Sequence, residues 1–176
     1  MRKIFVIGLL APLLALLAGC DTVSDMIVSN IPDMHEGEPS ILVELSAQRA
    51  YLYEGGELVA SSRISTGREG YDTPTGRFRV IKKDQDHRSS VYGYYADANG
   101  NCVMDNIDKR KDKMPPGCQF IGASMPFFLE FSPGYGLHAG YLPGFPASHG
   151  CVRMPYWKAR EFFNTAEVGT RIVVKP

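Results

Sequence analysis

Short apolar runs separated by turn-forming residues make up most of the chain beyond residue 40. The runs at 41–45 and 49–53 are β-type in composition, and the turn at 54–57 leads into a further run at 58–64, which predicts strands joined by a hairpin. Residues 78–82 alternate between apolar and basic, as a half-buried strand does. Further strands are expected at 127–131, 136–139 and 170–174.

The spacing becomes helical only after Pro155, which suits the first turn of a helix. The positions that recur at this spacing are Tyr156, Trp157, Ala159, Arg160, Phe162 and Phe163. Residues 84–118 predict an insertion over the sheet, in which the aromatic cluster at 92–95 is either packing or a substrate-covering flap. Many short strands with one or two helices predict a mainly β domain of sandwich or barrel type over residues 40–176.

The N-terminus follows a different pattern. Arg2 and Lys3 precede an apolar run at 4–18 that is too short to span a bilayer comfortably, and the run ends in Leu-Ala-Gly-Cys at 17–20. This end resembles a bacterial lipobox, which implies a lipoprotein signal peptide at 1–19, a lipid on Cys20 and a tether at 20–39. An uncleaved anchor or a plain secretory leader are the alternatives. The lipobox implies the periplasmic side of the cell envelope, and by analogy with enterobacterial sorting Asp21 favours the inner membrane.

Charge narrows the function little. The chain has 19 basic and 19 acidic residues, and loss of Arg2 and Lys3 with the leader leaves 17 against 19, a net charge of −2. No basic face is indicated, which argues against a nucleic-acid partner. The oligomeric state stays open.

Cysteine usage is more informative. With Cys20 lipidated, the exported part keeps Cys102, Cys118 and Cys151, and an odd count in an oxidising compartment leaves one thiol unpaired. Cys102 and Cys118 are candidates for a disulfide, which would contribute about 3 kcal/mol if unstrained. Two ordinary thiols are the alternative. Either way Cys151 is expected to be free.

The residues with the clearest chemistry lie between His138 and Arg153. A thiol is nucleophilic as the thiolate, and a nearby imidazole is the usual means of forming one. If the backbone is extended, His149, Cys151 and Arg153 share one face, and Arg153 favours the thiolate. His138 lies 13 residues before Cys151, behind a proline- and glycine-containing loop, so it is expected to reach the cysteine from a neighbouring strand.

The segment from His138, followed by Ser-His-Gly-Cys-Val-Arg at 148–153, resembles the signature of the L,D-transpeptidase catalytic domain, the YkuD family. The resemblance covers roughly residues 40–176. It includes Ser65-Thr66-Gly67, the run from Thr73 to Phe78, Met125-Pro126-Phe127-Phe128 and Gly136-Leu137-His138.

The resemblance implies Cys151 as the nucleophile and His138 as the general acid and base. Ser148, His149, Gly150 and Arg153 would support them, with backbone amides around Gly150 and Cys151 as oxyanion donors. Because no carboxylate adjoins His138 in sequence, a backbone carbonyl near residue 139 or 140 is expected to orient its ring. No metal or organic cofactor is implied.

The implied reaction is acyl transfer in peptidoglycan biosynthesis. Cys151 would form a thioester with a stem tetrapeptide, and an amine would resolve it, which either cross-links two stems or anchors an envelope lipoprotein. If water resolves it, the enzyme is an L,D-carboxypeptidase, and a non-catalytic wall-binding lipoprotein is a further alternative. Acylation by carbapenems is also implied. A papain-like protease has the opposite order of cysteine and histidine, and the caspase signature around the cysteine is absent.

Overall fold

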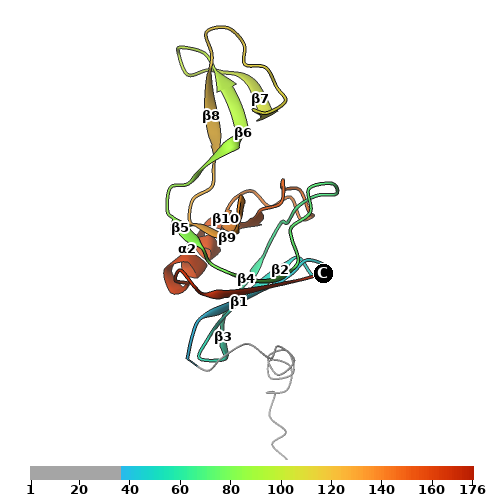
Figure 1. The fold of residues 1–176 in the computed structure, drawn as a ribbon, viewed down its shortest axis with the longest axis vertical. Coiled ribbons are helices and arrows are strands. Elements are labelled where there is room, and N and C mark those ends of the chain that lie inside the picture. The colour runs from blue at the N-terminus through green and yellow to red at the C-terminus, as the bar shows by residue number, and fades with distance from the viewer. Residues whose placement is uncertain (1–36) are drawn as a thin grey trace, which may run out of the picture. The chain divides into compact units, whose positions relative to one another are not determined.

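The computed structural model describes residues 37–176, which form three β-sheets and one helix (Figure 1). The predicted signal peptide, the lipidation site Cys20 and nearly all of the predicted tether lie outside these residues. Within the described range, no helix has the length and apolar character needed to cross a bilayer.

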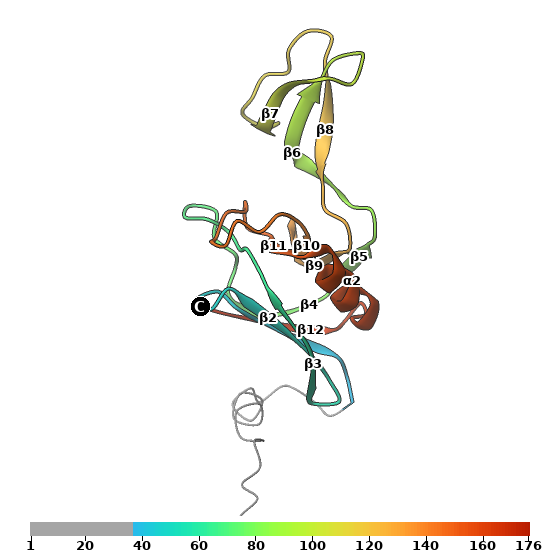
Figure 2. The same ribbon diagram turned by 180° about the vertical axis from the view of Figure 1, so that it is seen from behind.

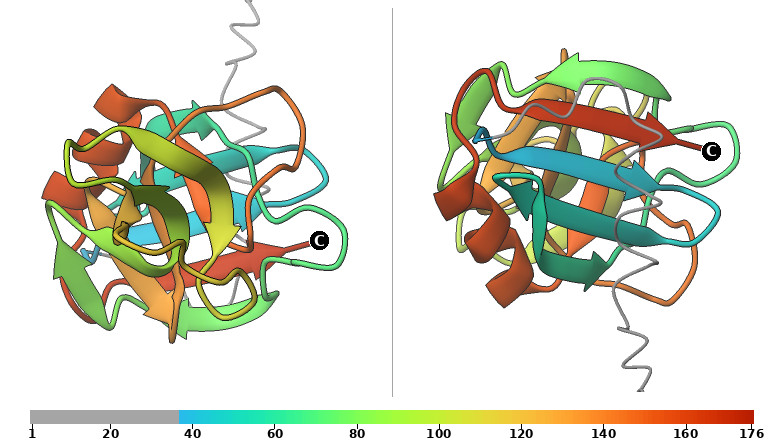
Figure 3. Two further views of the ribbon diagram at one scale, coloured as in Figure 1. Left: turned by 90° about the horizontal axis from the view of Figure 1, so that it is seen from above. Right: turned by 90° about the horizontal axis from the view of Figure 1, so that it is seen from below.

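The first sheet has five strands in the order β3-β2-β1-β12-β4, which lie side by side in the right panel of Figure 3. Its pairs are antiparallel except for β1 with β12, which run parallel. The strands are β1 (Ser40–Glu44), β2 (Arg49–Glu54), β3 (Glu57–Arg63), β4 (Gly76–Arg79) and β12 (Arg171–Lys175). The turn expected at 54–57 joins β2 to β3.

The second sheet has four strands in the order β11-β10-β9-β5. Here β10 and β11 run parallel, whereas β9 pairs antiparallel with both β10 and β5. The strands are β5 (Lys82–Asp84), β9 (Phe128–Ser132), β10 (Tyr135–Ala139) and β11 (Val152–Met154).

The hydrophobic core draws on both of these sheets and on helix α2 (Tyr156–Thr165), which is seen beside them in Figure 2. Ala159 and Phe162 of α2 are buried, three residues apart, as the helical spacing predicts. The mainly β fold and the helix after Pro155 are therefore confirmed.

The strand expected at 78–82 is divided between the two sheets. β4 ends at Arg79, and β5 begins at Lys82. Between them, Val80 is buried and its N–H donates to the Thr170 carbonyl of the first sheet, while the Ile81 N–H donates to the Glu130 carbonyl of the second. Apolar and basic side chains alternate in the same way along one strand as along two consecutive strands. The sequence pattern therefore could not show that the chain passes from the first sheet to the second at Val80 and Ile81.

The insertion predicted at 84–118 corresponds to a third sheet with the strand order β7-β6-β8, which extends past the predicted end because β8 begins at Gln119. Its strands are β6 (Arg88–Ala96), β7 (Cys102–Asp108) and β8 (Gln119–Ser124), and we call residues 88–124 the flap. Figures 1 and 2 show the flap projecting from one end of the sandwich. Sequence analysis did not identify these strands, because residues 102–106 of β7 are exposed without alternation.

The candidate disulfide between Cys102 and Cys118 is not formed, and both thiols are free. Ala96 of β6 pairs with Cys102 on one side and with Gln119, the neighbour of Cys118, on the other. Two strand spacings of about 4.8 Å therefore separate the cysteines. A disulfide requires Cα atoms about 4.4–6.8 Å apart, so the intervening strand prevents the bridge.

Candidate active site

The parallel pairing of β10 with β11 brings the two segments of the predicted site together. His138 lies opposite Arg153 in the register, and Cys151 directly precedes β11. Both segments open onto a cavity of about 310 Å³. Of the predicted site residues, Cys151, His138, Ser148, His149 and Arg153 line this cavity. The flap contributes Ser89, Tyr92, Ala123 and Ser124 to its wall.

His138 is buried, with 5% of its surface exposed, and its orientation is fixed by the backbone. Nδ1 lies 2.8 Å from the carbonyl oxygen of Ala139. Because a carbonyl can only accept, Nδ1 carries the proton and Nε2 keeps its lone pair. Burial lowers the pKa of His138 to about 4, assisted by the positive charge of Arg153. The expected carbonyl partner is confirmed, and the ring is neutral at neutral pH.

Cys151 lies in the cavity as a thiol. Burial raises the pKa of Cys151 above its ordinary value, although a hydrogen bond from the Gly136 backbone and the charge of Arg153 lower it. Its Sγ lies 3.6 Å from the carbonyl oxygen of Gly134, to which the thiol donates. Arg153 acts in the expected direction, but desolvation is the larger effect, so the thiol form is favoured in the unliganded cavity.

The loop before Cys151 is held by Ser148. Its Oγ donates to the Cys151 carbonyl at 2.5 Å and accepts the Gly150 N–H at 3.0 Å. Gly150 has φ +115°, and a Cβ there would lie 2.5 Å from Cε1 of Tyr135. Only glycine fits this position. The expected oxyanion role of the Gly150 amide is not supported, because Ser148 already binds it.

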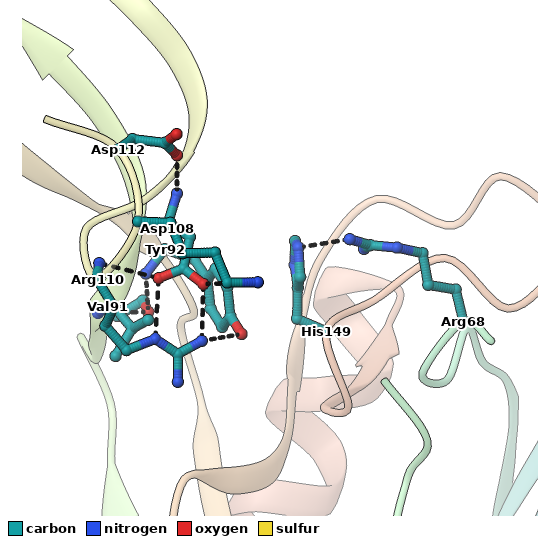
Figure 4. A network of polar contacts seen from close by, with 9 residues as sticks. Arg68, Val91, Tyr92, Asp108, Arg110, Asp112 and His149 are labelled. Carbon is teal, nitrogen blue, oxygen red and sulfur yellow. Dashed lines mark hydrogen bonds and ion pairs between the residues drawn. The ribbon is translucent and has the colours of Figure 1, made fainter. Parts of the chain in front are cut away.

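His149 is held between the flap and the sandwich (Figure 4). Its ring stacks on Tyr92 of the flap, with centroids 4.0 Å apart and planes 16° apart, and meets the Tyr71 ring edge-on at 4.8 Å. Nη2 of Arg68 lies 2.8 Å from Nε2. A guanidinium only donates, so Nε2 accepts, and burial together with the charge of Arg68 lowers the pKa of His149 to about 4. The lone pair of His149 is thus engaged.

The contacts of His149 identify Arg68 and Tyr92 as site residues that were not predicted. The assumption of an extended backbone before Cys151 is also corrected. The backbone is not extended from His149 to Cys151, because Gly150 has a positive φ and β11 begins only at Val152. Arg68 follows the Ser-Thr-Gly motif at 65–67 directly, and that position could have drawn attention to it. In the aromatic cluster at 92–95, Tyr95 is buried, which confirms packing for that residue, whereas Tyr92 lines the cavity, and covering of a substrate by Tyr92 stays a prediction.

Arg153 carries an uncompensated charge into the cavity. It lines the cavity and makes no ion pair within residues 37–176. In the same range, no three His, Cys, Asp or Glu side chains converge as metal ligands would.

The mixed-β sandwich, with a free cysteine and a buried histidine on one cavity, fits the expectation of an L,D-transpeptidase catalytic domain. The family model of the L,D-transpeptidase catalytic domain matches residues 38–174, and the chain belongs to this family, YkuD. The family comprises enzymes that act on peptidoglycan. No curated protein sequence matches the chain.

Solved structures share the fold. An L,D-transpeptidase from Mycobacterium smegmatis has a TM-score of 0.59 at 18% identity, covering 79% of this chain and 59% of its own. An L,D-transpeptidase from Stackebrandtia nassauensis has a TM-score of 0.58 at 19% sequence identity, and the match covers 90% of this chain and 68% of that one. The structure of an LD transpeptidase in complex with imipenem has a TM-score of 0.57 at 17% sequence identity, and the match covers 77% of this chain and 58% of that one. The chain thus spans less than two thirds of the first and third of these proteins.

Proposed function

We propose that the chain is a cysteine-dependent L,D-transpeptidase that acts on peptidoglycan stem peptides. The observation that carries the proposal is the placement of Cys151 and His138 on one cavity, with His138 held in the tautomer whose Nε2 can accept a proton. His149 is the less suitable base, because Arg68 already donates to its Nε2.

In the first half-reaction, the Cys151 thiol passes its proton to His138 while Sγ attacks the carbonyl of the third residue of a stem tetrapeptide. The bond to the terminal D-alanine breaks, and the leaving amine takes the proton from His138. A thioester remains on Cys151. In the second, an acceptor amine attacks the thioester carbonyl, gives up its proton and releases the thiol. The cross-link or the lipoprotein anchor is the product.

Two features of the cavity suit this substrate. A stem peptide is anionic, and Arg153 presents a positive charge without a carboxylate partner in residues 37–176. The buried neutral pair of Cys151 and His138 requires no charge separation until a carbonyl is bound. The oxyanion donors would be amides other than that of Gly150, and the Cys151 amide is the nearest candidate.

The N-terminal pattern supports a location for this activity. We propose that the chain is exported, lipidated at Cys20 and held on the periplasmic side of the inner membrane, with the domain reaching the wall on the tether. The wild-type protein should incorporate labelled palmitate, and replacement of Cys20 by alanine should abolish the incorporation. An unlabelled wild-type protein, or label that persists in Cys20→Ala, would contradict lipidation at Cys20.

Purified muropeptides provide the direct test of the reaction. Incubation with tetrapeptide stems should give a new cross-linked dimer, together with released D-alanine, detected by mass spectrometry. Loss of one alanine without a dimer would instead identify an L,D-carboxypeptidase. Unchanged muropeptides would support the non-catalytic wall-binding alternative, and the Cys151→Ala variant provides the blank for all three outcomes.

A further inference from the structure

A second cavity lies on the other side of the loop that follows β10. Its volume is about 510 Å³, compared with about 310 Å³ for the catalytic cavity. No acidic side chain is among its lining residues, which are Ala47, Gln48, Arg49, Arg63, Ile64, Leu142, Pro143, Gly144 and Pro155. The sequence motifs account for none of this surface.

Two arginines with no counter-ion give this cavity its charge. Arg49 of β2 and Arg63 of β3 are direct partners in the antiparallel register, and neither makes an ion pair within the described range. Like charges directly opposite one another destabilise a sheet. Glu44 of β1 is opposite Arg49 on its other flank but forms no ion pair with it, so its carboxylate offsets the repulsion only in part. An anion between the two guanidinium groups would relieve the repulsion.

The end of helix α2 adds to the positive potential. The helix begins directly after Pro155, which lines the cavity. It has no acidic residue in its first turn and no side-chain cap. The positive end of the helix dipole is therefore uncompensated next to the arginine pair.

The loop itself links this cavity to the catalytic one. Tyr141 lines the catalytic cavity, whereas its neighbours Leu142 to Gly144 line the second, so the two linings meet at consecutive residues of this loop. A hydrogen-bonded path runs in parallel. The Gln48 side chain binds Thr66 through both its amide nitrogen and its oxygen, and the Thr66 carbonyl accepts the Ser148 N–H at 2.9 Å.

We propose that the second cavity binds the free C-terminal carboxylate of the acceptor stem peptide while the amine of that stem reaches the thioester on Cys151. This inference rests on the proposed function and names a subsite for it. An acceptor stem carries a free C-terminal carboxylate as well as its amine, and paired guanidinium groups are suited to bidentate carboxylate binding. Leu142, Pro143 and Pro155 offer a rigid apolar wall for the alanine methyl group beside that carboxylate.

The test measures binding with the catalytic cavity closed. The full chain is first acylated with imipenem, and a fluorescent stem tetrapeptide is then titrated, with its C-terminal amide as the comparison. The acylated wild-type protein should bind the free acid about tenfold more tightly than the amide. Arg49→Gln/Arg63→Gln should abolish this difference. Arg160→Gln/Lys113→Gln, which removes two exposed charges elsewhere, should retain it.

Failure of this inference is distinct from failure of the proposed function. Equal affinity for acid and amide in the wild type, or a preference that survives in Arg49→Gln/Arg63→Gln, would overturn the carboxylate subsite even if imipenem acylates normally. If imipenem does not acylate the wild type, the proposed function fails, and the same titration on the untreated protein still tests the arginine pair. The rate of acylation should be unchanged in both double variants, which also confirms that they are folded.

Discussion

Burial sets the charge state of both groups at the proposed reaction centre. It lowers the pKa of His138 and raises the pKa of Cys151, so a neutral imidazole and a neutral thiol line the same cavity. A neutral pair is less reactive toward solvent-borne reagents than a preformed thiolate. Proton transfer to His138 then accompanies attack on a bound carbonyl, since His138 Nδ1 is fixed as a donor and Nε2 is left to accept.

The two histidines should differ in their contribution to rate. His138→Ala removes the proton acceptor, and acylation by a stem tetrapeptide at pH 7 should fall about a hundredfold or more. His149→Ala removes a ring whose Nε2 is already occupied by Arg68, so the loss should be smaller. Single-turnover acylation rates of both variants measure the difference. A larger loss for His149→Ala would reverse the assignment of the base.

Stability should depend on pH through the same residues. His138 and His149 have pKa values of about 4 in the fold, below their ordinary value of 6.5, so the unfolded chain binds protons more readily. This stability is fully present above about pH 6.5 and is lost as the pH falls towards about 4. Urea denaturation at several pH values should show the decline, and His138→Gln should make it shallower. A free energy of unfolding that is constant across this window would contradict the buried neutral state.

Among the elements, the flap and the loop before β11 complete the site together. Tyr92 stacks on His149, and its hydroxyl accepts from Nη2 of Arg110, which also forms an ion pair with Asp108 (Figure 4). Arg68 and Tyr71 hold the other side of His149. The wall of the cavity therefore depends on a contact between residues that are far apart in the sequence.

Removal of this contact should loosen the flap. An aromatic stack contributes about 0.5–1.5 kcal/mol, so Tyr92→Ala should raise the apparent KM for a stem tetrapeptide about two- to tenfold and speed hydrogen exchange in residues 88–124. Tyr92→Phe retains the ring and should have a smaller effect. Tyr94→Ala is the matched control, because the Tyr94 ring makes no aromatic contact within residues 37–176. Equal effects of the two alanine variants would show that the stack does not hold the flap.

Local patterns predicted the elements that are buried on one face or throughout. β1 and β10 are short runs buried almost throughout, whereas β2, β3, β9, β12 and α2 alternate between buried and more exposed positions, and all seven elements were expected close to their observed bounds. The flap strands show neither pattern, because β7 is largely exposed and β6 presents its aromatic residues to both the flap and the site. Arg68 and Tyr92 act through tertiary contacts with His149, which no local pattern encodes. The sequence motif was enough to identify Cys151 and His138 as candidate catalytic residues. Their charge states depend on burial, which can be seen only in the folded structure.

At the scale of the whole molecule, the account depends on one accessible thiol in a chain proposed to function outside the cytoplasm. Cys102 and Cys118 lie in the flap, and neither lines the catalytic cavity. Cys151 lies in the cavity with His138 and Arg153 and is not oxidised to a neighbour. Function, location and the acceptor subsite all presuppose that this sulfur forms the acyl bond.

The most direct test is intact-protein mass spectrometry after incubation with imipenem. The wild-type protein should gain the mass of one imipenem, peptide mapping should place it on Cys151, and Cys151→Ala should gain nothing, whereas Cys102→Ala/Cys118→Ala should react like the wild type. An adduct that persists in Cys151→Ala, or a wild-type protein that stays unmodified, would contradict the account.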